Sequence, residues 1–394
     1  MKKLLILNGS HSDIPLIRAG KKQGYYVITS GNREDLIGHS YADEYIYGDF
    51  SNPEGMLQIF KDKKIDAICS CCNDFGAITA SYMCENLGLP GHDSYSNTLI
   101  IHHKDKFKQF SMKYDIPTPR ANSYTNLEKA LADIEYYKDK YPLIVKPIDM
   151  TGGKGVSKIL DNKGYESSIR FAFEKSFSKG IVIEQFLTGT QHSFSTFLVN
   201  GKVVAYYSDN EYSFASPYLV STSCGPATKV NLVKDELITI AEKIAGILKL
   251  KNGVFHYQYI LCENKPYIIE ITRRCSGDMY PIPVERSTGI PWAEWIVKAE
   301  CGMSCNDFPR FMNQKKLGGR HCLISDKNGI IKNIYISEKI RKNIYADFRW
   351  SKEGDVIQNH LVDKIGVIFL EFENEDEMIE KSENILNYVK VICE

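Results

Sequence analysis

The sequence lacks several features that would assign it to a class directly. No stretch approaches the roughly 18 apolar residues of a membrane-spanning helix, so no membrane span is expected. The 49 Lys and Arg residues balance 49 Asp and Glu residues, which leaves no field of one sign and disfavours a nucleic-acid partner. The opening segment MKKLLILNGS has an apolar run of four residues, shorter than the ~7 to 15 of a signal-peptide core, and we expect a cytoplasmic protein.

Several nucleotide-binding signatures are missing too. Residues 8–13, Asn-Gly-Ser-His-Ser-Asp, lack the three glycines of a dinucleotide-binding turn, which disfavours a dehydrogenase. The turn Asn8-Gly9-Ser10 is open to two interpretations, an ordinary tight turn, which we favour, or an anion site. No P-loop pattern is present. The 11 cysteines are odd in number and scattered, so we expect reduced, mostly buried thiols, with reactivity considered only for Cys71 and Cys72.

The length and the apolar content favour a multidomain protein. With 394 residues, 43% of them apolar, the chain is long enough for two or three hydrophobic cores. Between residues 3 and 97, short apolar runs alternate with amphipathic stretches, a pattern that predicts parallel strands joined by right-handed helical crossovers. We therefore expect a first domain over residues 1–97 with a parallel sheet.

The middle of the chain predicts a second, larger unit over residues 98–305. A helical stretch from Ser96 to Tyr114 ends at the segment IPTPR, whose prolines favour an extended hinge. Residues 120–190 predict a small α/β module. Asn200-Gly201 then predicts a two-residue hairpin turn between two strands.

The rest of the chain is less regular. Residues 209–229 show no clear periodicity, which predicts a long functional loop. Residues 306–394 predict a small mixed unit with a strand at 367–372 and a final helix near 375–388. We expect a third domain there.

A second hairpin carries a row of polar residues. In an antiparallel pair closed by a loop at Cys262 to Pro266, Gln258 lies opposite Glu270, His256 opposite Thr272, and Leu261 opposite Tyr267. Opposed side chains have Cβ atoms ~5 Å apart and can share one cation. The row therefore predicts a binding face, with a solvated sheet face as the alternative.

Two further segments carry candidate binding groups. Lys146 ends an apolar strand and precedes the loop Thr151-Gly152-Gly153-Lys154-Gly155, whose glycines allow a phosphate to approach the backbone. A flexible hairpin loop is the alternative. Glu184 to Leu187 end another strand, where a carboxylate, exposed backbone and two apolar side chains can hold a purine. An edge strand with its Glu in water is the alternative there.

In this order, the segments resemble the ATP-grasp superfamily over nearly the whole chain, including the N-terminal unit. The arrangement is most similar to carboxylate-amine ligases, near the biotin carboxylase, N5-carboxyaminoimidazole ribonucleotide synthetase and carbamoyl phosphate synthetase branches. The resemblance implies a mixed α/β and α+β fold. It would have an N-terminal parallel-sheet pre-ATP-grasp domain, a two-lobed ATP-grasp domain with 120–190 as its mobile lobe, and a small mixed C-terminal domain.

The resemblance also implies roles for individual residues, with ATP and Mg²⁺ as the ligands. Lys104 and Lys146 would contact the ATP phosphates, and Arg274, Lys146 and Glu270 would be the catalytic set. Glu270, Gln258 and Thr272 would hold the metal. The remaining nucleotide contacts would come from the glycine loop and the purine-binding strand: Gly152, Gly153, Lys154, Gly155, Glu184, Phe186, Leu187, Gln191 and His192.

Three positions depart from the pattern of the family. Gln258 stands where the family has a second acidic metal ligand, Thr272 where it has Asn, and Gln191 where it has a Glu on the ribose. Replacing a carboxylate by an amide beside Mg²⁺ removes an attraction of about 4 kcal/mol at ~4 Å and an effective dielectric of ~20. We expect weaker metal binding that the amide oxygen partly restores.

The function expected from the resemblance is an ADP-forming ligase that joins a small-molecule carboxylate to an amine. The acceptor site is expected among Arg274, the 209–229 loop and the turns Gly9-Ser10 and Asn73-Asp74. Two alternatives remain open, an ATP-dependent carboxylase that uses bicarbonate and a catalytically weak or inactive ATP-binding regulatory protein. A homodimer is also expected from similar proteins.

Overall fold

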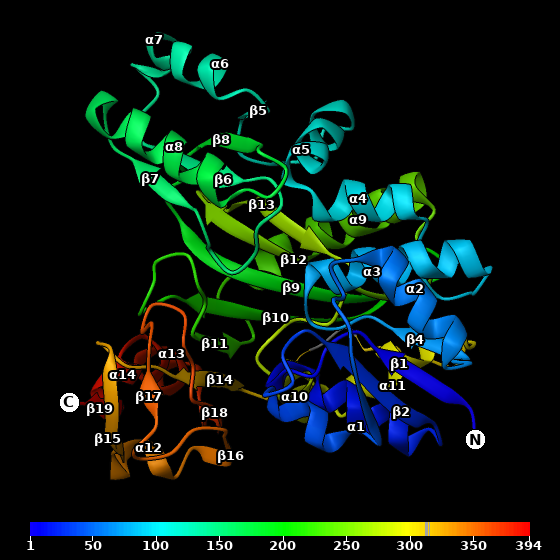
Figure 1. The fold of residues 1–394 in the computed structure, drawn as a ribbon. Helices are drawn as coiled ribbons and strands as arrows, with labels where there is room; N and C mark the ends of the chain where they lie inside the picture. Colours follow the sequence, from blue (N-terminus) through cyan, green and yellow to red (C-terminus); the bar gives the residue numbers. More distant parts are fainter. Residues whose placement is uncertain (312–313, 315) are drawn as a thin grey trace.

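The computed structural model describes residues 1–311, 314 and 316–394. Within them the strands form four sheets, and a large antiparallel sheet occupies the centre of the molecule (Figure 1). The predicted combination of a parallel N-terminal sheet, a two-lobed middle part and a small C-terminal sheet is confirmed. In the described residues no helix combines the length and the apolar character that a membrane span requires.

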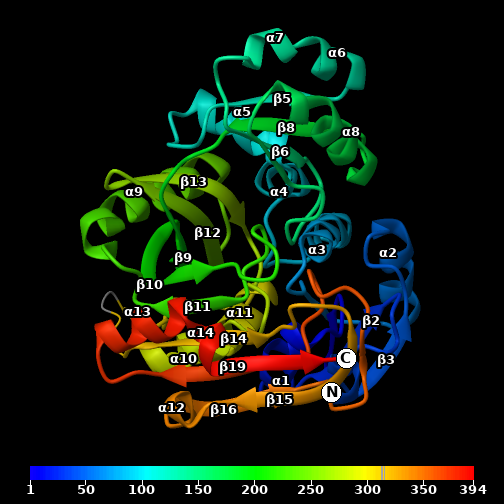
Figure 2. The same ribbon diagram turned by 90° about the vertical axis from the view of Figure 1, so that its left-hand side faces the viewer.

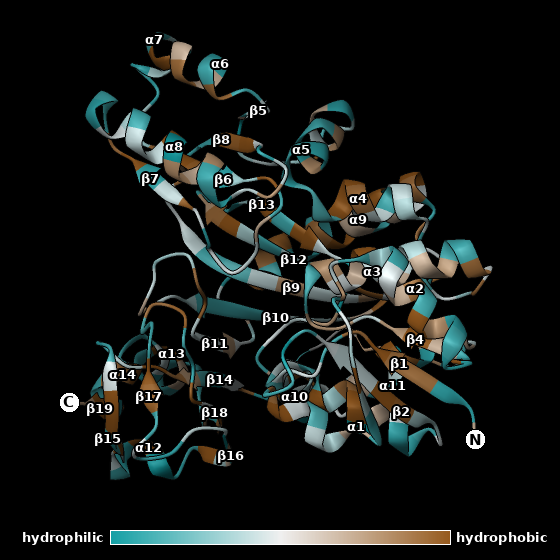
Figure 3. Ribbon diagram, in the orientation of Figure 1, coloured by the Kyte–Doolittle hydropathy of each residue, from teal (hydrophilic) through white to brown (hydrophobic). Residues whose placement is uncertain are grey.

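The N-terminal sheet has the order β3-β2-β1-β4, and all its strands are parallel, as predicted. Leu4, Leu5 and Ile6 are fully buried because helices cover both faces of the sheet, and Figure 3 shows β1 as largely hydrophobic. A Cβ atom at Gly9 would collide with the ring of His39. Packing against His39 therefore accounts for a glycine at this position, which favours the interpretation of Asn8-Gly9-Ser10 as a tight turn. The elements are β1 (Lys3–Ile6), η1 (His11–Asp13), α1 (Ile14–Lys22), β2 (Tyr26–Gly31), η2 (Ile37–Tyr41), β3 (Glu44–Tyr47), α2 (Pro53–Asp62), β4 (Ala67–Cys69) and α3 (Asp74–Leu87).

The connection to the middle of the chain consists of two helices where the sequence predicted one stretch. Helix α4 (Tyr95–His102) ends at His103, whose backbone is extended, with φ −102° and ψ 119°. Helix α5 (Lys104–Lys113) then starts in a new direction. Lys104 is thereby the first residue of a helix that approaches the small lobe (Figure 1).

The small lobe is a four-stranded sheet with the order β5-β8-β6-β7, which faces the large sheet (Figure 1). Helices α6 and α8 pack on one side of it around Tyr165, Ile169 and Phe173. The elements are β5 (Ala121–Tyr124), α6 (Leu127–Ala132), α7 (Ile134–Tyr137), β6 (Leu143–Pro147), β7 (Ser157–Ile159), η3 (Asn162–Gly164), α8 (Tyr165–Lys175) and β8 (Ile181–Gln185).

The large sheet has the order β13-β12-β9-β10-β11-β14-β18-β16 and is antiparallel throughout. The turn between β9 (Thr190–Val199) and β10 (Lys202–Tyr212) is Asn200-Gly201, both with positive φ, as predicted. The expectation of an unstructured 209–229 is wrong, because β10 runs on to Tyr212 and β11 (Thr222–Gly225) pairs with it. Helix α9 (Val230–Leu248) covers one face of this sheet, and β12 (Gly253–Cys262) and β13 (Lys265–Thr272) follow.

The C-terminal part divides between two sheets. Strands β14, β16 and β18 extend the large sheet, whereas β17, β15 and β19 form a separate small one, of which β15 and β19 are seen side by side in Figure 2. The predicted strand is observed as β18, and the predicted final helix near 375–388 is divided into two helices, α13 and α14. The elements are α10 (Pro281–Thr288), α11 (Trp292–Glu300), β14 (Gly318–Leu323), β15 (Gly329–Ile336), α12 (Glu338–Arg341), β16 (Ile344–Arg349), β17 (Val356–Ile357), β18 (Gly366–Glu371), α13 (Glu375–Glu383), α14 (Ile385–Tyr388) and β19 (Val389–Cys393).

The cysteines are all unpaired, as expected, and most are buried. Burial raises the pKa of the Cys71 and Cys72 thiols well above the ordinary range. Because the thiolate is the reactive form, these two thiols are poor nucleophiles.

Candidate nucleotide site

A cleft of about 200 Å³ opens between the small lobe and the large sheet. Strands β6 and β8 supply one wall, and β9, β12 and β13 supply the other. Many of the residues singled out from the sequence line it, namely Lys104, Lys146, Gly152, Gly153, Glu184, Phe186, Leu187, Gln191, Gln258 and Glu270. The fold therefore brings together residues that are up to 166 positions apart in the chain, Lys104 and Glu270.

Two lysines hold the carboxylate of Glu184 at the back of the cleft. Lys146 Nζ lies 3.0 Å from Glu184 Oε2, and Lys108 Nζ lies 3.3 Å from Oε1. Lys108 and Glu184 are each only 2% exposed. Burial raises the pKa of Glu184, but the two ammonium groups outweigh it and hold the pKa below its ordinary value. Burial also lowers the pKa of Lys108 to about 8, against the opposing effect of Glu184.

Lys108 is a site residue that the sequence analysis did not assign. It lies on α5 one helical turn after Lys104, so the two side chains share a face of that helix. The i, i+4 spacing was the available signal, but the burial of Lys108 depends on the docking of the small lobe.

Lys104 connects the other wall to the glycine loop. Its Nζ lies 3.0 Å from Glu270 Oε1 and donates a hydrogen bond of 2.7 Å to the carbonyl oxygen of Met150. Burial lowers the pKa of Lys104, but the carboxylates of Glu270 and Asp74 outweigh it and the pKa is raised. The ammonium group therefore stays charged at the mouth of the cleft.

The glycine loop packs against residues 213–221, the segment that joins β10 to β11. Gly152 and Gly153 both have positive φ, 63° and 71°. A Cβ atom at Gly153 would lie 2.5 Å from the carbonyl oxygen of Tyr218, whereas one at Gly152 would meet only Leu219 at 3.8 Å. Tyr218 also lines the cleft, so the 213–221 segment forms part of its wall.

The hairpin of β12 and β13 has the predicted register near the cleft. Gln258 pairs with Glu270, and His256 with Thr272. The predicted pairing of Leu261 with Tyr267 is wrong, because a bulge between Gln258 and Tyr259 shifts the register by one residue. The turn is also shorter than expected, since Cys262 already pairs with Lys265.

Glu211, on β10, is a second residue that the sequence analysis missed. Its Oε2 accepts hydrogen bonds from Gln191 Nε2 at 2.8 Å and from Gln258 Nε2 at 2.7 Å. Burial, followed by the nearby carboxylate of Asp209, raises the pKa of Glu211 to about 7. Asp209 and Glu211 are two residues apart, a spacing that places both side chains on one face of a strand. The sequence predicted a loop there, so this spacing was not used.

These polar groups belong to a row that crosses one face of the large sheet. Side chains two residues apart on a strand share a face, and paired residues on neighbouring strands lie side by side. The row consists, strand by strand, of Glu270 (β13), Gln258 (β12), Ser193 (β9), Asp209 and Glu211 (β10), Ser223 (β11) and Arg320 (β14).

Residues 102–278, which include this cleft, match the sequence model of a family described as an ATP-grasp domain. The chain contains an ATP-grasp domain. The resemblance inferred from the sequence is thereby confirmed.

Solved structures share the fold of this chain over its whole length. Phosphoribosylglycinamide synthetase from Anaerococcus prevotii is 24% identical, with a TM-score of 0.76 and 100% of both chains covered. L-amino acid ligase from Bacillus licheniformis is 19% identical, with a TM-score of 0.83 and 100% of this chain and 99% of that chain covered. N5-carboxyaminoimidazole ribonucleotide synthetase from Thermotoga maritima is 18% identical, with a TM-score of 0.76 and 100% of both chains covered. At these identities the likeness establishes the fold.

Several predicted residues of the ATP-grasp domain lie outside the cleft lining. The assignment of His192 to the nucleotide is corrected, because side chains alternate along β9 and His192 stacks on Tyr259 in the core on the opposite face. Lys154 is exposed, and Gly155 packs against Pro147, 2.6 Å from where a Cβ atom would lie. Thr272 is on the same face of β13 as Glu270, two residues on.

Arg274 contacts the N-terminal domain at the first residue of α3 and is not part of the cleft lining. Its Nε donates a hydrogen bond of 2.6 Å to Asp74 Oδ1, and His102 Nδ1 lies 3.2 Å from the same oxygen. Burial lowers the pKa of Arg274, but Asp74 outweighs it and raises the pKa. The arginine and the Asn73-Asp74 turn, which the sequence analysis had grouped, are therefore in contact.

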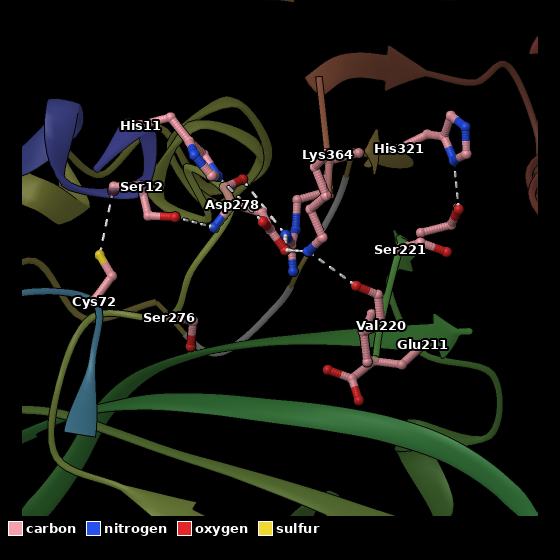
Figure 4. A network of polar contacts seen from close by, with 12 residues as sticks. His11, Ser12, Cys72, Glu211, Val220, Ser221, Ser276, Asp278, His321 and Lys364 are labelled. Atoms are coloured by element: carbon pink, nitrogen blue, oxygen red, sulfur yellow. Dashed lines mark hydrogen bonds and ion pairs between the residues drawn. The ribbon is translucent and has the colours of Figure 1, made fainter. Parts of the chain in front are cut away.

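A second polar cluster lies at the Arg320 end of the row, where three parts of the chain meet (Figure 4). The carboxylate of Asp278 contacts Lys364 Nζ at 2.7 Å, Arg320 Nη1 at 2.9 Å and His11 Nε2 at 3.4 Å. Its backbone N–H donates to Ser12 Oγ at 2.8 Å. Burial raises the pKa of Asp278, but Lys364, His11 and Arg320 outweigh it, and the pKa lies well below its ordinary value.

The 213–221 segment links this cluster to the glycine loop. Lys364 Nζ donates to the carbonyl oxygen of Val220 at 3.3 Å, a contact drawn in Figure 4, while Tyr218, two residues earlier, packs against Gly153. Residues 218–220 therefore connect the glycine loop of the nucleotide cleft with Lys364 in the cluster around Asp278.

Proposed function

We propose that this chain is an ATP-dependent ligase that activates a small-molecule carboxylate as an acyl phosphate and joins it to an amine. The observation that carries the proposal is the meeting of Lys104, Lys146 and Glu270 with a glycine loop in one cleft. Two structural neighbours are named as a synthetase and a ligase, which supports the same reaction class.

The cleft offers a separate group for each part of ATP. Phe186 and Leu187 provide an apolar slot for the adenine, and Gln191 an amide for the ribose hydroxyls. Lys104 and Lys146 are fixed cations for the phosphates, since each already holds a carboxylate in a defined position. The backbone of Gly152 and Gly153 can approach the terminal phosphates.

The donor set near Glu270 fits Mg²⁺. This ion takes oxygen ligands and usually binds through one or two carboxylates together with substrate phosphates. Glu270 supplies a carboxylate and Gln258 an amide oxygen. Thr272 Oγ1 is buried with no hydrogen-bond partner in the described part of the chain, so it is free to accept a ligand. When bound, the ion would neutralise charge on the terminal phosphates.

The reaction then needs positioning more than a protein nucleophile. An oxygen of the substrate carboxylate attacks the γ-phosphorus, the bond to the β,γ-bridging oxygen breaks, and ADP leaves. The amine attacks the acyl carbon, phosphate leaves with the bonding electrons, and the nitrogen loses its proton. Lys104 and Lys146 stabilise charge on the phosphates, and Arg274 would steady the acyl phosphate on the side of the N-terminal sheet.

Hydrolysis of the acyl phosphate must be prevented until the amine arrives. The glycine loop and the 213–221 segment lie over the cleft and already contact one another. Their closure over the triphosphate would exclude water.

The test is a phosphate-release screen of carboxylates and amines with ATP and Mg²⁺. A productive pair should release phosphate, and Lys146→Ala and Glu270→Ala should each reduce that release at least about 100-fold. Lys138→Ala, which removes an exposed lysine from the same lobe, should leave it unchanged. Turnover like that of the wild type in either cleft variant would refute the site assignment.

Two alternatives are resolved by the same screen. Release that depends on bicarbonate, without another carboxylate, would indicate the carboxylase. The amides at Gln191 and Gln258 favour the regulatory ATP-binding protein, which binds ATP without forming ADP with any substrate. The homodimer stays a prediction that sedimentation analysis would test.

A further inference from the structure

Gln258 stands in the sheet between two carboxylates. It pairs with Glu270 on β13, and its side-chain nitrogen donates a hydrogen bond of 2.7 Å to Glu211 Oε2. Gln258 and Glu270 line the cleft, whereas Glu211 is buried and does not belong to the lining. Glu211 is therefore positioned behind the amide, on the side away from the nucleotide.

This contact determines which way the amide faces. A carboxylate accepts hydrogen bonds and an amide carries one donor group and one acceptor group, so only the NH₂ end of Gln258 can meet Glu211. The carbonyl oxygen must then point away from Glu211. Gln191 is held by the same oxygen at 2.8 Å, so its acceptor end is oriented in the same way.

We propose that Glu211 is a positioning residue that presents the amide oxygen of Gln258 to the divalent cation of the nucleotide. The inference rests on the proposed function, because it requires a metal–nucleotide complex in this cleft. It explains how a glutamine can occupy the place of an acidic ligand. The carboxyl group is retained behind the amide, where it fixes the orientation of the ligand.

The contact has a further consequence for substitutions. Two carboxylates at hydrogen-bond distance cannot both stay ionised. Gln258→Glu alone would place a second carboxyl group against Glu211, so one of the two would have to be protonated. Exchanging the two groups, with Glu211→Gln and Gln258→Glu together, keeps one carboxylate and one amide in contact. The amide at position 211 would then donate to the carboxylate at position 258, whose other oxygen faces the cation.

The experiment measures Mn²⁺ binding to the full chain by electron paramagnetic resonance, with the non-hydrolysable analogue AMP-PNP present. Glu211→Gln should weaken Mn²⁺ binding about tenfold or more, as loss of a partner of a metal ligand commonly does. The double variant should return to within about threefold of the wild type. Gln258→Glu alone should bind Mn²⁺ more weakly than the double variant. Glu300→Gln, which removes a buried carboxylate that holds Ser70 outside the cleft, should have no effect.

The outcomes separate this inference from the proposed function. Unchanged Mn²⁺ affinity in Glu211→Gln, or a double variant no better than that single variant, would overturn the role of Glu211. The wild type would still bind Mn²⁺ with AMP-PNP in either case, and the proposed function would stand. Absence of binding in the wild type would refute both. If Glu211→Gln fails to fold by thermal unfolding, the comparison of Gln258→Glu with the double variant decides.

Discussion

Gly152 and Gly153 offer a matched pair of substitutions that tests whether the 213–221 segment forms the wall of the nucleotide site. Both glycines have positive φ, so alanine at either position costs about 1 to 2 kcal/mol of backbone energy. Only Gly153→Ala adds a collision, because the new Cβ atom would lie 2.5 Å from the carbonyl oxygen of Tyr218 and 2.7 Å from its Cβ. At Gly152 the nearest atom is 3.8 Å away.

The collision has a definite expected size. Overpacking of this kind costs about 1 to 3 kcal/mol, and 1.4 kcal/mol is a factor of ten in affinity. In the free protein the glycine loop can move away from Tyr218 and relieve the collision, whereas closure over the nucleotide brings the two segments together again. Gly153→Ala should therefore bind AMP-PNP with Mg²⁺ about 10- to 100-fold more weakly than Gly152→Ala, measured by titration calorimetry. The change in the free energy of unfolding measures how much of the cost falls on the free protein. Equal affinities in the two variants would show that closure over the nucleotide does not require the contact between the glycine loop and Tyr218.

Two predictions concern buried charge. Lys108→Met leaves the buried carboxylate of Glu184 with Lys146 as its one cation among the residues described. The substitution should lower the free energy of unfolding, measured in urea, by about 3 kcal/mol. An unchanged urea midpoint would contradict the ion pair between Lys108 and Glu184. Three buried histidines have pKa values lowered to about 3 or 4, mainly by burial, so between pH 6.5 and about 4 the unfolded chain binds more protons. Stability should then fall as the pH falls, by about 1.4 kcal/mol per pH unit for each histidine, and His321→Gln should remove about a third of that slope in melts from pH 7 to 5. A slope unchanged by that substitution would contradict a neutral buried ring. The three are His192, His256 and His321.

The polar hairpin was predictable because its information is local. Two strands joined by a short turn fix which residues oppose each other, and the pairing of Gln258 with Glu270 follows from counting. The prediction was wrong beyond the bulge, since the counting of paired residues across the turn does not report an extra residue in one strand. The backbone N–H of Ile268 donates to the carbonyl oxygen of Pro117, a contact from outside the hairpin at that point.

Glu211 and Lys108 could not be assigned from the sequence because their roles arise from distant pairings. Glu211 becomes a strand residue only when β11 pairs with the end of β10, and β11 is held in turn by β14, about 100 residues later. Lys108 is an ordinary polar residue of a helix until the small lobe brings Glu184 to it. The helical and strand periodicities of a sequence predict neither the pairing of β10 with β11 nor the contact between Lys108 and Glu184.

The large sheet explains how the C-terminal segment contributes to the polar row. Its strand β14 pairs with β11 and places Arg320 at the end of the polar row, and Lys364 reaches the same carboxylate from the loop before β18. The domain boundary between residues 305 and 306 stays a prediction. It separates Asp278 from two of the residues that contact it, Arg320 and Lys364. A ligand at the Arg320 end would therefore contact residues from the first 12 positions of the chain, from the ATP-grasp domain and from the last strands together. The polar face of the sheet is consequently assembled from several parts of the chain and not from one domain.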